Sequence, residues 1–67
     1  MNMNKDEAEL FRRCADLGCR ISGGDFRVYQ MDDGKAWRVG FGGVGYVDAP
    51  TLAEALALAL KTYAERR

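Results

Sequence analysis

The chain has 67 residues, with ten Lys and Arg against ten Asp and Glu, and a formal net charge of zero at pH 7. This length allows one small domain, expected over residues 1–67, with a core small enough to gain from burial in a homodimer. Proteins that bind phosphate backbones are usually clearly basic, and this chain is not. It also has no histidine, which removes the commonest general base and the commonest metal ligand.

The first predicted helix begins after Asn4, which suits an N-cap because Glu7 follows three residues later. Apolar side chains then recur at helical spacing and predict one buried stripe. The stripe consists of Leu10, Phe11, Cys14 and Leu17. Gly18 is expected to end this helix as a left-handed C′ residue.

The stretch from Phe26 to Val47 is predicted to form three short antiparallel strands joined by two glycine turns. Asp33-Gly34 favours a two-residue type I′ turn, which sets Met31 opposite Ala36 and Phe26 opposite Phe41. Because side chains alternate along a strand, one face collects mainly apolar residues and the other mainly polar ones. The apolar face holds Phe26, Val28, Gln30, Trp37, Val39 and Phe41; the other holds Arg27, Tyr29, Met31, Ala36, Arg38 and Gly40. We expect Trp37 to be largely buried.

Gly42-Gly43 offers a second two-residue turn. This turn would set Tyr46 opposite Val39 on the apolar face and would send Gly45 and Val47 to the other face. Glycine is frequent in this segment, so the backbone could instead host a β-bulge.

Thr51 is predicted to cap a second helix, with Glu54 three residues on as in a capping box. One stripe of this helix is apolar, and Leu58 falls outside it. The stripe consists of Leu52, Ala55, Leu56, Ala59, Leu60 and Tyr63. The element order predicts an α+β fold, αβββα, in which both helices pack on one face of a three-stranded antiparallel meander and leave the other face open.

The residues predict no catalytic site. Cys14 lies on the buried stripe, and its spacing to Cys19 is not Cys-x-x-Cys, so packing is preferred to a redox pair. Two cysteines cannot complete a structural zinc site, and Asp32-Asp33 suits a turn better than a metal loop. The glycines at 40–45 lack the G-x-G-x-x-G frame and a Walker lysine. We expect no cofactor and no enzymatic activity.

No apolar run has the form of a secretory signal or the length of a membrane span, so a cytoplasmic location with reduced thiols is expected.

The αβββα order resembles that of double-stranded RNA-binding domains, over the whole chain but as topology alone. That family carries a lysine cluster at the start of its last helix, where this chain reads Pro50-Thr51-Leu52-Ala53-Glu54 without lysine. The resemblance therefore does not carry RNA binding to this chain. The run from Tyr46 to Leu60 also resembles the strand-to-helix corner of HicB-type antitoxins, in which a Thr-Leu-x-Glu-Ala-type helix start follows a strand.

Two functions follow from these observations. The leading hypothesis is a non-catalytic protein-binding module, in one specific form a phage or mobile-element inhibitor of a host defence complex, of the anti-CRISPR kind. Its predicted partner-binding residues are Arg27, Tyr29, Met31, Arg38 and Val47. The alternative is single-stranded nucleic-acid binding, with Tyr29 stacking on bases between Arg27 and Arg38. The same residues are equally compatible with a solvated sheet face.

Leu58 is a candidate dimer contact. A single exposed leucine needs no explanation, yet a small core gains from burial between two chains. We predict a two-fold homodimer through this helix or through an exposed sheet edge.

Overall fold

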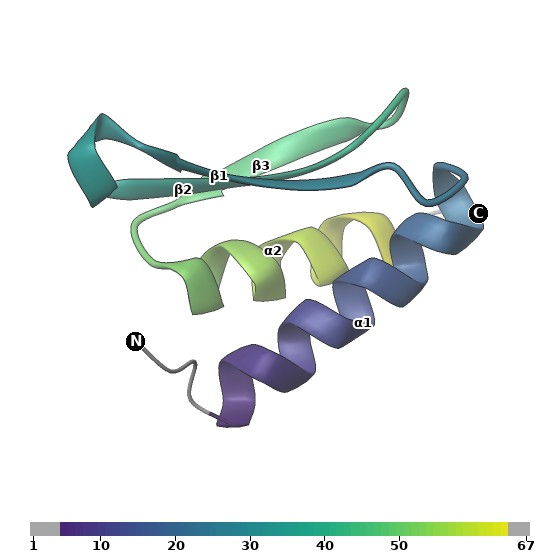
Figure 1. Cartoon of the computed structure of the whole chain (residues 1–67), viewed down its shortest axis with the longest axis horizontal. Coiled ribbons are helices and arrows are strands. Elements are labelled where there is room, and N and C mark those ends of the chain that lie inside the picture. Colours follow the sequence, from purple (N-terminus) through teal and green to yellow (C-terminus); the bar gives the residue numbers. More distant parts are fainter. Residues whose placement is uncertain (1–4, 65–67) are drawn as a thin grey trace.

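Both helices lie on the same face of one antiparallel sheet in the computed structural model, which describes residues 5–64 (Figure 1). The strand order in the sheet is β1-β2-β3, so β2 is central. The elements are α1 (Lys5–Ile21), β1 (Phe26–Met31), the short 3-10 segment η1 (Asp32–Gly34), β2 (Ala36–Phe41), β3 (Gly45–Ala49) and α2 (Leu52–Ala64). The predicted αβββα fold is confirmed. The predicted N-cap at Asn4 lies outside the described residues.

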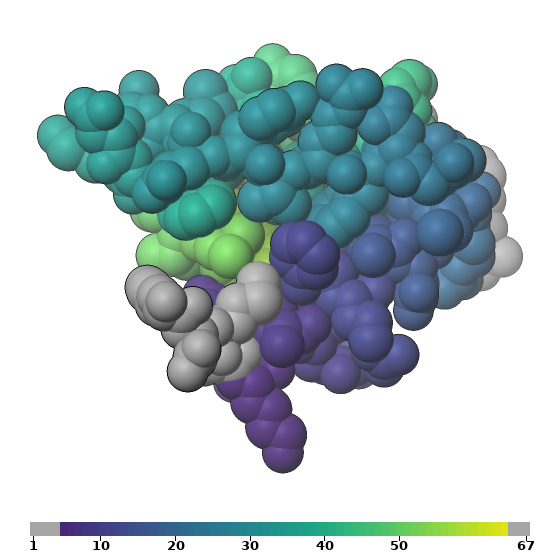
Figure 2. Space-filling model, viewed as in Figure 1, coloured from purple at the N-terminus to yellow at the C-terminus, as the bar shows by residue number. Residues whose placement is uncertain are grey.

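The core lies where the inner face of β2 meets the two helices. Leu56, Val39 and Cys14 are the largest fully buried side chains. Trp37 packs against this core but is only partly buried, contrary to expectation. It lies near the η1 end of the hairpin, which extends beyond the helices in Figure 1. In the space-filling view, the teal β1 and turn lie above the purple and blue of α1, with the green of α2 visible between them (Figure 2).

The register of the first hairpin is the predicted one, from Phe26 opposite Phe41 to Met31 opposite Ala36. The predicted turn at Asp33-Gly34 is confirmed: Asp33 (φ 57°, ψ 35°) and Gly34 (φ 90°) have the left-handed conformations of a type I′ turn, and the Lys35 N–H donates to the Asp32 carbonyl at 3.1 Å. Strand pairing ends at Met31–Ala36, and Asp32 also has positive φ, at 52°. Aspartate tolerates this left-handed region better than most residues, so the Asp-Asp-Gly run still makes the reversal.

The predicted end of α1 at Gly18 is wrong, because Gly18 lies inside the helix and is buried. A Cβ atom at this position would come within 3.0 Å of the Phe26 Cβ atom, so its hydrogen side chain lets α1 approach β1 closely. The helix ends three residues later. There the Ser22 hydroxyl donates to the Gly18 carbonyl at 2.9 Å, and Gly23 and Gly24 take positive φ values of 63° and 92°.

The predicted register of β3 is also wrong, by one residue. Gly45 pairs with Phe41 and Val47 with Val39, so Val44 is an extra residue in the turn. The Val44 N–H donates to the Phe41 carbonyl at 3.0 Å, and Gly43 has φ 76°, as a type II turn requires. Val47 therefore faces the core, and Tyr46 and Asp48 face outward.

The second helix follows its predicted pattern. The Thr51 hydroxyl accepts from the Glu54 N–H at 3.1 Å and donates to the Glu54 carboxylate at 2.9 Å, a variant of the expected capping box. The predicted stripe packs inward, with Ala55, Leu56, Ala59 and Tyr63 buried, whereas Leu58 is 40% exposed. Neither helix within residues 5–64 has both the length and the apolar character needed to cross a bilayer.

Gly45 provides a test of the β3 register. It has φ 151°, and a Cβ atom there would lie 2.6 Å from the Tyr63 hydroxyl oxygen, which donates to the Tyr46 carbonyl. Gly45→Ala should lower the free energy of unfolding by about 2–4 kcal/mol, through backbone strain and crowding together. Gly43→Ala is the matched control, because it has positive φ but nothing within 4 Å, and should cost about 1 kcal/mol. Urea unfolding followed by Trp37 fluorescence measures both, and equal losses would contradict the assigned register.

Candidate functional site: the open sheet face

Six residues form the outward-facing surface of the sheet at its centre, and we call this surface the open face. They stand in two cross-strand rows, because directly opposed residues share a face. One row is Tyr29, Arg38 and Asp48; the other is Arg27, Gly40 and Tyr46. Both helices lie on the opposite side of the sheet, so neither helix covers the open face (Figure 1).

Arg38 and Asp48 form a two-pronged ion pair across β2 and β3. The Arg38 Nε and Nη2 atoms donate to the two Asp48 carboxylate oxygens at 2.7 and 3.0 Å. The same guanidinium lies over the Tyr46 ring, with its Cζ atom 3.9 Å from the ring centroid. The hydrogen bond from Arg38 lowers the pKa of Asp48, against a smaller opposing effect of burial, and the pair raises the pKa of Arg38. This geometry fixes the arginine in place.

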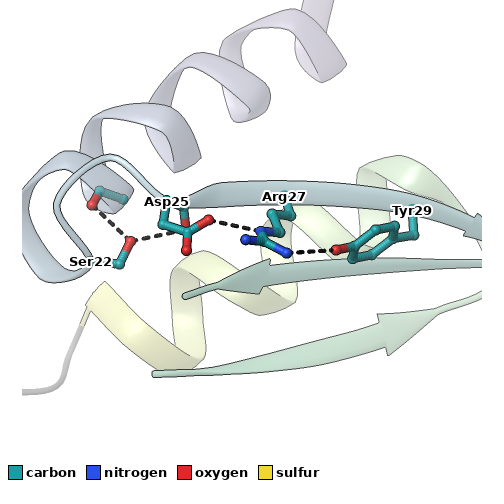
Figure 3. A network of polar contacts seen from close by, with 5 residues as sticks. Ser22, Asp25, Arg27 and Tyr29 are labelled. Carbon is teal, nitrogen blue, oxygen red and sulfur yellow. Dashed lines mark hydrogen bonds and ion pairs between the residues drawn. The ribbon is translucent and has the colours of Figure 1, made fainter. Parts of the chain in front are cut away.

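Arg27 is held along β1 by its own neighbours (Figure 3). Its Nη1 atom donates to the Tyr29 hydroxyl at 3.4 Å, and its Nε atom donates to the Asp25 carboxylate at 2.8 Å. The hydrogen bond to Tyr29 and then the contacts with Asp25 raise the pKa of Arg27. Both open-face arginines therefore already have a carboxylate partner within the chain.

A shallow hollow of about 560 Å³ lies over Gly40, between Arg27 and Tyr46. A Cβ atom on Gly40 would come within 3.1 Å of the Tyr46 Cβ atom, so any larger residue would crowd Tyr46 and fill the floor. Beside it, the Asp25 carboxylate occupies the space that a Gly42 side chain would need. The glycines thus shape this surface, although Gly40 itself is buried.

The two tyrosines are the exposed aromatic side chains of this surface: Tyr29 is 46% exposed and Tyr46 is 57% exposed. Each is anchored by a neighbouring arginine, Tyr29 through its hydroxyl and Tyr46 through its ring. The open face therefore presents two fixed aromatic groups with polar groups around them.

Four of the five predicted partner-binding residues lie on the outer side of the sheet: Arg27, Tyr29, Arg38 and, at the turn end, Met31. The fifth, Val47, packs against the core instead, because the extra turn residue reverses the alternation of β3. Tyr46 takes the place predicted for Val47. One sequence signal could have indicated this: the predicted register would have pointed Asp48 toward the core opposite Trp37, where burying a carboxylate is costly.

The remaining reactive groups do not gather into a second site. Cys14 is buried, its thiol donates to the Leu56 carbonyl at 3.4 Å, and burial raises its pKa to about 11. Cys19 is exposed, and neither cysteine is in a disulfide. Among residues 5–64, no three His, Cys, Asp or Glu side chains converge in a way that could hold a metal ion.

No protein-family model, curated protein or solved structure matches this chain.

The ion pair predicts a titration effect. Because Arg38 lowers the pKa of Asp48, the pair stabilises the fold above the unfolded-state pKa of Asp48, and this contribution is lost as pH falls through the lower folded-state value. Arg38→Gln should raise the pKa of Asp48, measured by carboxyl-carbon NMR titration. Arg27→Gln, the control, should leave it unchanged. An Asp48 pKa that does not respond to Arg38→Gln would contradict the pairing.

The cysteines predict a difference in thiol reactivity. The thiolate is the reactive form, so the buried Cys14, with its pKa raised to about 11, should be inert at neutral pH while Cys19 reacts. A colorimetric thiol reagent should titrate one group in the native protein and both in denaturant. Cys19→Ser should abolish the native reaction, and reaction persisting in that variant would show that Cys14 is accessible.

Proposed function

We propose that the protein is a small non-catalytic binding module that contacts a protein partner through the open face. The observation that carries this proposal is the pair of exposed tyrosines, Tyr29 and Tyr46, each fixed by an arginine. Tyrosine and arginine are enriched among the residues that dominate binding energy at protein interfaces. Side chains that are already ordered lose less conformational entropy on binding, which favours a specific contact.

The charges of this surface favour a protein over a nucleic acid. Arg27 and Arg38 are matched by Asp25 and Asp48, and the chain as a whole has a formal net charge of zero. A phosphate backbone would have to compete with both carboxylates, and it would be repelled by them. A protein surface can instead offer apolar and polar groups to the tyrosines without displacing either ion pair.

Two further features support a non-catalytic role. The chain has no histidine, and the Cys14 thiol is buried with a raised pKa. The Ser22 hydroxyl donates to backbone carbonyls, and Thr51 caps α2, so neither is poised as a nucleophile. Within the class of binding modules, we propose an inhibitor of a host defence complex, encoded by a phage or mobile element; this step rests on small size and on the lack of catalytic groups.

Single-stranded nucleic acid is the second candidate. The exposure of Tyr29 and Tyr46 on neighbouring rows favours it, because aromatic rings can stack with bases regardless of sequence. Such binding would weaken steeply with salt.

The test removes the aromatic groups and leaves the ion pairs. Tagged wild-type protein should retain a host protein that the double variant Tyr29→Ser/Tyr46→Ser does not, and retention should survive raised salt. With the isolated partner, the double variant should bind roughly 100-fold more weakly, as expected for loss of two dominant interface residues. The melting temperature should change little, because both side chains are exposed.

The control variant is Arg12→Ser/Arg20→Ser, which removes two exposed side chains from α1. It should bind the partner like the wild type. Equal binding by the wild type and the tyrosine variant would move the contact off the open face. Binding of a labelled oligothymidine that falls steeply with salt, and that is lost in the tyrosine variant, would favour the nucleic-acid function instead.

A further inference from the structure

The side of α2 that faces away from α1 carries an exposed leucine beside a depression of about 470 Å³. Leu58, which is 40% exposed, lines it together with Ala57 and with residues 48–50, which lead from β3 into α2. Glu54 and Lys61 also line it. This surface is independent of the open face, and the inference does not depend on the proposed function.

The charges on this side of α2 are arranged symmetrically. Glu54 and Lys61 are seven residues apart, which is about two helical turns, so they lie on the same side of the helix. The midpoint between them falls between Ala57 and Leu58. If a second copy of α2 lies antiparallel across this midpoint, each Glu54 meets a Lys61 of the other copy, and the two Leu58 side chains lie near the two-fold axis. A parallel arrangement would instead oppose like charges.

We propose that this side of α2 is the interface of a two-fold homodimer, with the two α2 helices antiparallel about that midpoint. The occupant is a second copy of this chain, because Glu54 and Lys61 of α2 are complementary in charge to the same two residues of an antiparallel copy. In a two-fold interface, the contact between Glu54 of one copy and Lys61 of the other occurs twice.

The unpaired edge of the sheet at β3 supports the same geometry. The strand order is β1-β2-β3, α1 contacts β1, and α2 lies against β2 and β3, so the side of α2 away from α1 is next to the β3 edge. A strand rises about 3.3 Å per residue and a helix about 1.5 Å per residue. The middle of β3 and the midpoint between Glu54 and Lys61 therefore lie at about the same distance from the connection between β3 and α2. A second copy on α2 would therefore also shield this edge, which otherwise offers unpaired backbone groups.

The experiment uses charge reversal and mixing. Sedimentation of the wild type from about 5 to about 500 μM at low ionic strength should show a reversible dimer. Lys61→Glu and Glu54→Lys should each weaken self-association at least about tenfold, because each variant introduces two like-charge contacts. Glu54→Lys also removes the bond from the Thr51 hydroxyl at the start of α2, so circular dichroism first establishes that this variant is folded. An equimolar mixture of these two variants should associate about as well as the wild type, since in a heterodimer both contacts are again between opposite charges.

The control is a pair with the same change in net charge at sites away from this surface, Asp16→Lys and Lys35→Glu, both exposed. Each control variant should self-associate like the wild type, and mixing the two control variants should not increase association. A wild-type protein that stays monomeric over this range would overturn the proposal. So would variants that dimerise undiminished, or a mixture of Lys61→Glu and Glu54→Lys that fails to associate.

Discussion

Burial of the inner face of β2 is the contact on which the rest of the structure depends. Val39 and Phe41 on this strand are almost completely buried, and β2 is the strand that pairs with both of the others. Both helices cover this same side, where their apolar stripes meet the strand in one small core. Because strand residues alternate in direction, packing Val39 and Phe41 inward forces Arg38 and Gly40 outward. The open face is thus a direct consequence of how the core is filled.

The parts of the fold that local chemistry determines could be predicted from the sequence. An Asp-Asp-Gly reversal between two alternating segments determines the β1–β2 register, since a slip of one residue would turn Arg27 and Arg38 inward. Thr51 with Glu54 determines the start of α2, and the spacing of Leu56, Ala59 and Tyr63 determines its buried side. In each case the strongest local signal and the tertiary packing agree.

Contacts between distant residues decide the features that were predicted wrongly. Gly18 has the form of a helix end, but its role is to let α1 approach Phe26 on β1, which only the packed structure reveals. Around residues 42–45, glycines have no side chain to indicate which face of the strand is buried. The sequence therefore allows one register with Val44 and Tyr46 facing inward and another with Val47 facing inward. The bond from Tyr63 to the Tyr46 carbonyl and the pairing of Asp48 with Arg38 fit only the observed register. The candidate site consequently gained Tyr46 and lost Val47.

Asp25 joins three parts of the molecule at one residue. Its carbonyl accepts from the Gly42 N–H and from the Ser22 hydroxyl that also bonds to the end of α1, while its carboxylate holds Arg27 (Figure 3). A partner that drew Arg27 away with a carboxylate of its own would leave the charge of Asp25 uncompensated at the junction of α1, β1 and the β2–β3 turn. An acidic ligand would therefore have to compete with Asp25 for Arg27, whereas the partner we propose can contact Arg27 without displacing it.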